Sequence, residues 1–319
     1  MNNKTMKFLV TGGAGFIGSH IVERLVKQGH FVRVLDNFCS GKKENLSFST
    51  EYELITGDIR DSDTCVKACK GIDYVLHQAA LRSVPKSMER PHEYNEVNID
   101  GTVNMLEAAL KSEVKRFVYA SSSSVYGEAV SFPQTETDPS YLISPYALTK
   151  LADEFYARIF SKNYSLETVG LRYFNVFGPR QSLDDEYAVV IPKFIDCMLN
   201  DKNPPVHGDG KQSRDFTFVG NVVDVNILAA TTPGITCEAF NVACGTEHSI
   251  LDLVAILNKI MHKNISPTHT PPRQGDVRRT LADISKLKKS LNYTPKVNFE
   301  EGLRLTTDWF AKKSVAVKT

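Results

Sequence analysis

Residues 7–18 read KFLVTGGAGFIG, a short apolar strand that runs directly into a glycine-rich turn. An amphipathic segment continues to Lys27, so that strand, turn and helix come in that order. Glycines 12, 15 and 18 permit a tight turn, close approach of the backbone to a pyrophosphate, and close packing of the helix on the strand. The start of the helix offers unpaired N–H groups to an anion. The stretch therefore predicts a dinucleotide-binding turn.

The chain after this turn supplies the acidic residue of a dinucleotide site. Gly29 ends the predicted helix, and residues 31–35 form a second apolar strand. Asp36 closes that strand 24 residues after Gly12, where its carboxylate can accept hydrogen bonds from an adenosine ribose. Because a carboxylate at this position would repel a 2′-phosphate, Asp36 favours NAD over NADP as the cofactor.

Strands and helices alternate through the rest of the first half. Apolar strands are predicted at residues 53–55, 74–80 and 116–120, and a helix is predicted at 95–111. Alternation of this kind indicates an α/β fold with a doubly wound, parallel Rossmann-type sheet. In such a sheet ligands bind at the carboxyl ends of the strands.

The second half of the chain has a less regular pattern. After Gly178-Pro179 the sequence turns irregular, with short helical and strand-like pieces separated by loops. We expect residues 1–178 to form an NAD-binding Rossmann domain and residues 179–319 to form mostly a smaller α/β region that binds the substrate. Segments near 222–245 are expected to return to the first sheet.

A second informative stretch extends from Ser121 to Lys150. Tyr146 and Lys150 are four residues apart on a predicted helix and share one of its faces. The serines at 121–124 follow an apolar strand whose end can reach the same point. An ammonium beside a tyrosine favours the phenolate and lowers the tyrosine pKa, so Tyr146 could act as a base. Beside a dinucleotide motif, this pattern indicates proton transfer at an alcohol.

Composition narrows the possible partners and location. The 319 residues are 42% hydrophobic and 24% charged, with a formal net charge of +1, which disfavours nucleic acid or an anionic membrane as a partner. No apolar segment approaches the roughly 20 residues that a membrane-spanning helix needs. Residues 1–5 lack the apolar run of a signal peptide, so a cytoplasmic location is expected. The six cysteines lack zinc spacing, and we expect reduced thiols and no metal site.

Four further residues allow more than one interpretation. His77 lies within an apolar strand, and we interpret it as a core histidine. Asp58 follows a strand end, where it could meet the adenine or cap the next helix. Arg214 and Arg273 lie in the region expected to bind the substrate. Their guanidinium groups suit a diphosphate, although either could form a surface ion pair instead.

Nine stretches, which cover nearly the whole chain, resemble the extended short-chain dehydrogenase/reductase family, and within it the nucleotide-sugar 4-epimerases. They are TGGAGFIGSH (11–20), LDNF (35–38), GDIRD (57–61), HQAA (77–80), ASSSSVYGE (120–128), SPYALTK (144–150), LRYFNVFGPRQ (171–181), SRDF (213–216) and RQGDVRRTLADISK (273–286). The nearest resemblance is to the bacterial UDP-N-acetylglucosamine 4-epimerases of polysaccharide synthesis. It implies that Tyr146 removes the proton of the sugar 4-OH while hydride leaves C4 for NAD, giving a transient 4-keto sugar. Ser122 is then the catalytic hydroxyl, and Lys150 assists Tyr146.

The same resemblance implies two sets of binding residues. The cofactor is expected to contact Gly12, Gly15, Phe16, Ile17, Gly18, Asp36, Asn37, Ser40, Gly41, Asp58, Ile59, Gln78, Ala79, Ala80, Asn98, Tyr146, Lys150 and Tyr173. The UDP-sugar is expected to contact Arg82, Ser83, Ser122, Ser123, Ser124, Tyr146, Asn175, Gln181, Val189, Arg214, Arg273, Asp276 and Thr280. A homodimer is also expected, formed by the helices that contain Leu106 and Phe155.

Three positions bear on which sugar is bound. Thr280 aligns with a position that is tyrosine in strict UDP-galactose epimerases and small in those that accept N-acetyl sugars. This favours UDP-GlcNAc and UDP-GalNAc, with UDP-Glc and UDP-Gal as further substrates. Arg82 departs from the N-acetyl pattern, which has glycine there, and Val189 replaces a smaller alanine. Arg82 could instead pair with the carboxylate of a uronic acid, such as UDP-GlcA or UDP-GlcNAcA.

Other reactions of the same family are less well supported by the residues after Ser122. The 4,6-dehydratases carry an Asp-Glu pair there and the uronic acid decarboxylases carry a Glu, whereas this chain has Ser123-Ser124. Elimination of water needs a second acid or base, and these serines do not supply one. A dehydratase or a decarboxylase is therefore disfavoured.

Overall fold

A seven-stranded parallel sheet forms the centre of the computed structural model, which describes residues 5–183, 190–272 and 277–318. The strand order is β11-β6-β5-β4-β1-β2-β3. The strands are β1 (Lys7–Thr11), β2 (Phe31–Asp36), β3 (Glu53–Thr56), β4 (Tyr74–His77), β5 (Arg116–Ser122), β6 (Glu167–Tyr173) and β11 (Glu238–Val242). The predicted Rossmann-type α/β fold is confirmed.

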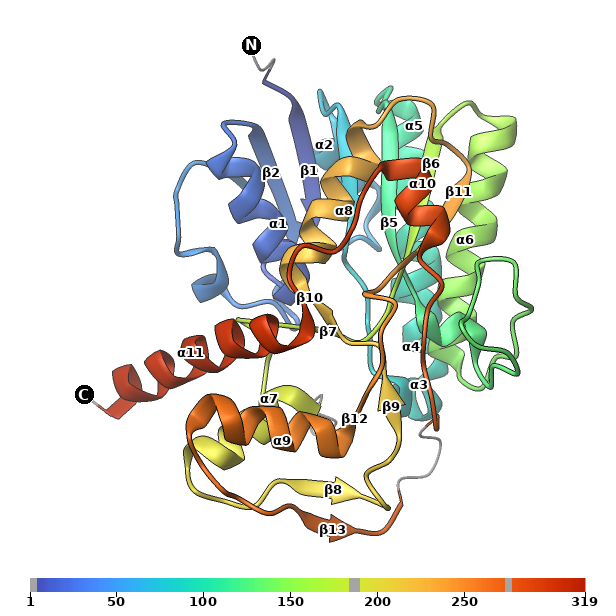
Figure 1. Cartoon of the computed structure of the whole chain (residues 1–319). Coiled ribbons are helices and arrows are strands. Elements are labelled where there is room, and N and C mark those ends of the chain that lie inside the picture. The colour runs from blue at the N-terminus through green and yellow to red at the C-terminus, as the bar shows by residue number, and fades with distance from the viewer. Residues whose placement is uncertain (1–4, 184–189, 273–276, 319) are drawn as a thin grey trace.

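Helices cover both faces of the sheet (Figure 1). On one face α1 (Phe16–Lys27) packs beside α8 (Val219–Thr231), and Ile21 and Val222 join one apolar core there. On the other face α2 (Ser62–Cys69), α5 (Gly101–Lys111) and α6 (Pro145–Asn163) bury a second core. Because both faces are covered, the strands are nearly continuous apolar runs rather than alternating ones.

The segment after β6 builds a smaller region, which lies below the sheet in Figure 1. Its helices α7, α9 and α11 surround a third apolar core, where the rings of Phe177, Phe216 and Phe299 contact one another. The helices are α7 (Val190–Leu199), α9 (Ile250–Met261) and α11 (Phe299–Lys318). Three short pairs complete it, β7 (Val176–Phe177) with β10 (Thr217–Phe218), β9 (Ser213–Arg214) with β12 (His248–Ser249), and β8 (Pro205–His207) with β13 (Thr268–Thr270).

The chain returns to the large sheet after this excursion. α8 packs against β4, β5 and β6, and β11 pairs with β6 from Glu238 opposite Val169 to Val242 opposite Tyr173. α10 (Ser285–Leu291) then packs against β11 and α8. The edge strand of the cofactor-binding sheet therefore comes from a part of the sequence that follows residue 190.

Two local predictions differ from the structure. The helix predicted at 95–111 is divided into a π-helical turn η2 (Asn95–Asp100) and α5, and two short helices, α3 (Val84–Glu89) and α4 (Pro91–Tyr94), precede it. The interpretation of Asp58 as a helix cap is wrong. Asp61 caps α2 instead, because its carboxylate accepts the N–H of Asp63 (3.2 Å), while Asp58 lies before the helix. Two short 3-10 helices, η1 (Lys43–Leu46) and η3 (Ser123–Tyr126), complete the fold.

Candidate active site

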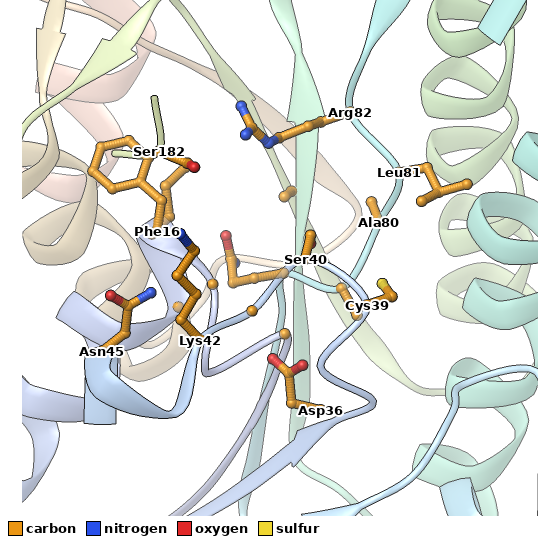
Figure 2. Close-up of a pocket in the computed structure, with 18 of the residues that line it drawn as sticks. Phe16, Asp36, Cys39, Ser40, Lys42, Asn45, Ala80, Leu81, Arg82 and Ser182 are labelled. Atoms are coloured by element: carbon orange, nitrogen blue, oxygen red, sulfur yellow. The ribbon is translucent and has the colours of Figure 1, made fainter. Parts of the chain in front are cut away.

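A cavity of about 570 Å³ opens at the carboxyl ends of the strands, as the fold predicts. Its walls come from the glycine-rich turn, the loop after β2, the segments after β3 and β4, and the start of α6. Figure 2 shows Asp36 at one end of this cavity and Arg82 toward the other. Thirteen residues of the predicted cofactor set line it together, namely Gly12, Gly15, Phe16, Ile17, Gly18, Asp36, Asn37, Ser40, Gly41, Asp58, Ile59, Gln78 and Ala79. Ala80, Tyr146, Lys150 and Tyr173 line it as well.

The glycine-rich turn is shaped to admit a ligand backbone. Gly12 has a φ of +63°, and a Cβ there would lie 2.8 Å from the backbone nitrogen of Ala79. A Cβ on Gly18 would lie 2.2 Å from the carbonyl oxygen of Gly12, far inside contact distance. No side chain caps the start of α1 at Gly15. The turn is therefore packed as a pyrophosphate cradle requires, with helix N–H groups facing the cavity.

Asp36 ends β2 beside this cradle. Its carboxylate is largely buried and accepts the backbone N–H groups of Ala14 (2.9 Å) and Phe38 (2.8 Å). A Cβ on Gly41 would lie 2.9 Å from the same carboxylate, so the loop passes close over it. The group is thus fixed in place as a charged acceptor at the rim of the turn.

Asp58 lies next to Asn37 in the same part of the wall. Its carboxylate accepts hydrogen bonds from Asn37 Nδ2 (2.8 Å) and Arg60 Nη2 (2.8 Å). The bound Arg60 guanidinium holds the pKa of Asp58 well below its usual value, so the carboxylate stays ionised at neutral pH. Asp58 and Ile59 line the cavity beyond Asp36, in the direction that an adenine would extend.

The segment after β4 forms the floor. Tyr173 Oη donates to Gln78 Oε1 (3.0 Å), and Asn226 Nδ2 donates to Tyr173 Oη (2.8 Å), which fixes both cavity residues. Asn98 does not line the cavity. It is buried behind the floor, where its side chain binds the N–H (2.8 Å) and the carbonyl (3.0 Å) of Leu81 and so holds the floor segment.

His77 is a neutral core residue. Thr11 Oγ1 lies 2.8 Å from its Nδ1, and Thr102 Oγ1 lies 3.2 Å from its Nε2. Burial and the nearby Lys150 charge lower the pKa of His77 to about 3, so the ring carries no charge at neutral pH. Both ring nitrogens are occupied by hydroxyl groups, and the expectation of a core histidine is confirmed.

The predicted base and its lysine lie on one face of α6. The helix begins at the Ser144 cap, whose Oγ accepts the N–H of Ala147 (3.2 Å), and Pro145 occupies the first turn. Tyr146 follows in that first turn, at the cavity wall, and Lys150 lies one turn later. The Lys150 side chain is 3% exposed and forms an ion pair with Asp153 (3.2 Å).

The serines at the end of β5 have different partners. Ser121 Oγ donates to Glu154 Oε1 (2.6 Å), so this hydroxyl is used to join β5 to α6. Ser122 Oγ donates to Ser124 Oγ (3.1 Å) and accepts the N–H of Ser124 (3.1 Å), which starts η3. The cavity wall at this point is formed by Ala120 and Ser121. Ser122, Ser123 and Ser124 lie just beyond it.

The predicted substrate residues are only partly brought together. Arg82 and Gln181 line the cavity, whereas the Ser83 hydroxyl caps α3. Asn175 Nδ2 donates to Thr280 Oγ1 (2.9 Å), so these two form one cluster outside the wall. Arg214 is buried and donates to the carbonyl of Ser213 (2.7 Å). Val189, Arg273 and Asp276 lie outside the described residues.

Gln181 has an unusual environment. The side chain is 4% exposed, and its Nε2 donates to the carbonyl of Val176 (3.0 Å). Among the described residues its Oε1 has no hydrogen-bond partner. The turn that carries it is tied to α1, because His20 Nε2 donates to the carbonyl of Pro179 (2.8 Å) and Arg180 pairs with Glu23. Gln181 therefore lines the cavity from a fixed turn, with its Oε1 enclosed rather than open to the cavity.

Several lining residues were not predicted. Asn45 Nδ2 (2.8 Å) and the N–H of Lys42 (3.0 Å) both donate to the carbonyl of Ala14, so the segment after Gly41 closes over the turn. Both could have been suspected, since they follow the Asp36 loop directly. The other unpredicted residues include Arg180, Ser182, Asp196, Asn200, Trp309 and Lys313. Trp309 and Lys313 come from α11, and no pattern in the sequence links that helix to the cofactor turn.

Comparison with known families agrees with this geometry. The sequence pattern described as the NAD dependent epimerase/dehydratase family matches residues 8–243, which is most of the chain. The chain belongs to this family. NAD is the cofactor of this family.

This chain is similar to several nucleotide-sugar 4-epimerases of the NAD-dependent epimerase/dehydratase family. A putative UDP-glucose 4-epimerase of Methanocaldococcus jannaschii is 39% identical over 94% of this chain and 97% of its own length. The structure of a UDP-N-acetylglucosamine 4-epimerase from Methanobrevibacter ruminantium, in complex with UDP-N-acetylmuramic acid, is 41% identical, with a TM-score of 0.93 over 97% of this chain and 99% of its own. A UDP-glucuronic acid 4-epimerase from Bacillus cereus, in complex with UDP-glucuronic acid and NAD, is 34% identical, with a TM-score of 0.88 over 97% and 100%. Nucleotide-sugar 4-epimerisation with NAD is therefore the activity of this group of the family.

Two further features are absent from the described residues. No helix in those ranges is long and apolar enough to cross a membrane. No cluster of three or more histidine, cysteine or acidic side chains placed to hold a metal ion is found in the same part of the chain.

Removal of the Asp36 carboxylate tests the preference for NAD. We expect Asp36→Ala to weaken NAD binding by about tenfold or more, because hydrogen bonds to a charged group typically contribute about 1.5–3 kcal/mol. We expect Asp36→Asn to discriminate less between NAD and NADP, since it removes the charge but keeps the shape. Isothermal titration with each dinucleotide measures both effects. Unchanged discrimination in the Asn variant would contradict the role of the charge.

Proposed function

We propose that this protein is a cytoplasmic UDP-sugar 4-epimerase that interconverts UDP-GlcNAc and UDP-GalNAc, with UDP-Glc and UDP-Gal as further substrates. The observation that carries the proposal is that Tyr146 and Lys150 line the same cavity as the cofactor turn. The residues after Ser122 are Ser123 and Ser124 rather than acids, which suits reversible oxidation at C4 better than elimination. A dehydratase or decarboxylase activity is correspondingly disfavoured.

The proposed chemistry requires one proton to move in each direction. Tyr146 takes the proton of the sugar 4-OH as its base, and Lys150 stabilises the phenolate with its charge. Ser122 orients the C4 oxygen through its hydroxyl. Bound NAD supplies the hydride acceptor and, in the second half of the cycle, the hydride donor. After the 4-keto sugar has rotated in the site, Tyr146 returns the proton to the C4 oxygen, and C4 then has the opposite configuration.

The size of Thr280 supports an N-acetyl sugar. Thr280 lies outside the cavity wall, where its hydroxyl accepts a hydrogen bond from Asn175, and a side chain this small leaves more room for an acetamido group than a tyrosine would. Gln181 does not separate the candidate sugars, because each of them carries hydroxyl groups that could donate to an amide oxygen.

A specific observation favours the second candidate, a UDP-uronic acid 4-epimerase. Arg82 lines the cavity at the end opposite Asp36 (Figure 2). A guanidinium there could form a bidentate pair with the C6 carboxylate of UDP-GlcA or UDP-GlcNAcA. The similarity to the B. cereus enzyme, which was solved with UDP-glucuronic acid, is consistent with this alternative.

A proton NMR time course of the sugar anomeric signals tests the choice between them. UDP-GlcNAc, UDP-Glc and UDP-GlcA are supplied separately at equal concentration, and we expect UDP-GalNAc to appear fastest. Turnover of UDP-GlcA alone would replace the first candidate by the second. Free NADH, or loss of water or CO2, would place the protein in another reaction class.

An Arg82→Gln variant tests the choice between the two candidate substrates by changing the protein rather than the sugar. For an N-acetyl enzyme we expect turnover of UDP-GlcNAc to change by less than about threefold, because the lost charge has no counterpart on the sugar. For a uronic acid enzyme, loss of a charged partner is expected to raise KM for UDP-GlcA by about tenfold or more. The two KM values, measured by the same NMR assay, separate these outcomes.

We further propose that the protein forms a homodimer through α6. Leu148 (52% exposed), Phe155 (57%) and Ile159 (48%) are large apolar side chains open to solvent on this helix. Their spacing places them along one side of the helix, and an apolar stripe of this kind favours burial against a partner. A second copy of the chain is the partner that a symmetric interface requires.

A charged substitution in this stripe tests the dimer. We expect Phe155→Arg to convert the dimer into a monomer, because it places a charge at the centre of an apolar contact. Val130→Arg is the matched control, since Val130 is an exposed apolar residue outside α6. Sedimentation equilibrium measures both variants. A wild-type monomer, or dimers in both variants, would contradict the proposed interface.

A further inference from the structure

Lys150 has a counter-ion of its own that the mechanism above does not use. Asp153 lies one turn further along α6, and its Oδ2 is 3.2 Å from the Lys150 ammonium. The two side chains are only 3% and 2% exposed. The pair is therefore enclosed between α6 and the sheet, away from the water that would otherwise solvate both charges.

The surroundings leave Asp153 as the only carboxylate in contact with Lys150 within the described residues. Thr102 Oγ1 donates to the carbonyl of Asn98 (2.5 Å), and this hydroxyl is also a neutral neighbour that helps to lower the pKa of Asp153. Asp153 Oδ1 has no hydrogen-bond partner in the same ranges, so the ammonium is the main support of this carboxylate. The other titratable groups that interact electrostatically with the pair are His77 on β4, Tyr119 on β5 and Glu154 on α6. Arg172 on β6 pairs with Glu154, and Tyr146 lies one turn before Lys150 on α6.

Each of these neighbours is already accounted for. His77 is neutral, and its ring is held by Thr11 and Thr102. Glu154 forms a buried ion pair with Arg172 (2.7 Å) and accepts the Ser121 hydroxyl. Burial raises the pKa of Tyr119, so this phenol stays protonated. None of them can replace Asp153 as the counter-ion of Lys150.

A buried lysine such as Lys150 keeps its proton only when another group stabilises its charge. Burial disfavours the charged form of a lone ammonium, and buried lysines without a partner lose their protons at or below neutral pH. A neutral amine at position 150 could not stabilise the phenolate of Tyr146. An opposite charge in direct contact restores the ammonium.

We propose that Asp153 is a positioning residue, which fixes the Lys150 side chain in the cavity wall and keeps it cationic so that Tyr146 can act as the base. The inference rests on the proposed function for the role of Tyr146. Asp153 itself touches neither substrate nor cofactor, since it does not line the cavity.

The pH range of this effect follows from the carboxylate. Burial raises the pKa of Asp153 to about 6, partly offset by the Lys150 charge, so the ion pair is intact above that pH. Without the carboxylate, the Lys150 ammonium is expected to lose its proton as the pH rises through the neutral range. The wild-type protein should therefore retain its activity well above neutral pH, where an Asp153→Asn variant loses it.

The first test follows Tyr146 directly and does not require turnover. The ultraviolet absorbance of tyrosinate is titrated in each background with and without Tyr146→Phe, and the difference gives the Tyr146 titration alone. In Asp153→Asn we expect the Tyr146 midpoint to rise by about one pH unit or more, because the lysine charge beside it is lost. An unchanged or lowered midpoint would overturn the proposal.

Glu154→Gln is the matched control. It replaces the neighbouring carboxylate of the same helix by an amide and changes the local charge by the same amount, but Glu154 contacts Arg172 rather than Lys150. An effect of charge alone would lower the Tyr146 midpoint in both variants. If direct contact with Lys150 is what matters, the Tyr146 midpoint rises in Asp153→Asn only. Identical shifts of the Tyr146 midpoint in the two variants would contradict the proposal.

A measurement on the wild-type protein covers the case in which Asp153→Asn does not fold. The side-chain nitrogen of Lys150, assigned with Lys150→Arg, is followed by NMR as the pH rises. We expect the ammonium signal to persist through the neutral range despite burial, and its loss there in the wild type would overturn the proposal. If the wild type epimerises no UDP-sugar, the proposed function fails, while both titrations still report on Asp153.

Discussion

Replacing Tyr146 with phenylalanine is expected to lower the rate of epimerisation by about a thousandfold. The substitution removes a single oxygen from a side chain at the cavity wall and leaves the ring that packs at the start of α6. General acid–base catalysis by a positioned side chain typically contributes about 10²–10⁴ in rate, and here one hydroxyl serves both half-reactions. The kcat for UDP-GlcNAc, measured by coupled assay or NMR, should fall by this factor.

The control for this result is another tyrosine of the same helix. Tyr156 is partly exposed on α6 and does not line the cavity, so Tyr156→Phe should retain wild-type kcat. The Tyr146→Phe protein should also keep its bound NAD and its unfolding midpoint, because within the described residues the phenol oxygen makes no hydrogen bond that supports the fold. A Tyr146→Phe enzyme with more than about a tenth of the wild-type kcat would show that another group is the base.

The second large effect is expected at Gly18. An alanine there would place its Cβ 2.2 Å from the carbonyl oxygen of Gly12 and 2.8 Å from Cα of Gly13, and backbone atoms cannot move aside as a flexible side chain can. The start of α1 must shift away from the turn, which opens the pyrophosphate cradle. We expect purified Gly18→Ala to contain less than about a tenth of the wild-type NAD and to lose about 1–3 kcal/mol of unfolding free energy.

Gly29→Ala separates loss of the cofactor from loss of stability. Gly29 follows α1 at a φ of +76° with open space where a Cβ would lie. The variant should therefore lose only about 1–2 kcal/mol of unfolding free energy, the amount that a left-handed backbone conformation costs an alanine. It should therefore be destabilised to a similar extent but keep its NAD. Nucleotide released on denaturation gives the NAD content, and urea unfolding gives the free energy. Equal loss of NAD from both variants would mean that stability, rather than the shape of the turn, governs binding.

The cofactor half was predictable because its signals are local. The run from Lys7 to Gly18 contains a strand, a turn and a helix in one short stretch, and the demands of the turn on glycine are visible in the sequence itself. The acid at Asp36 follows from the next strand end. Gly12, Gly15, Gly18 and Asp36 lie where the pattern places them, and all four line one cavity.

The substrate half was less predictable because its contacts are made between distant segments. β7, β9, β10 and β12 have only two residues each, too few to show a period of two in the sequence. The partners of Asn175 are Asp215 and Thr280, which come from two other parts of the chain. The buried Oε1 of Gln181, which has no hydrogen-bond partner among the described residues, is likewise visible only in the folded chain. The burial of Asp153 could not be predicted from the sequence, because it depends on how α6 packs against the sheet.

The path of the chain through the sheet also affects how the protein is made. β6 has β5 on one side, and its other edge is covered by β11, which begins about seventy residues later, at Glu238. During synthesis, N-terminal segments fold first. The outer backbone hydrogen-bonding groups of β6 therefore stay unpaired until β11 has been synthesised. A truncated or stalled chain that ends before β11 would display an open strand edge, which makes incomplete copies the most aggregation-prone form of this protein.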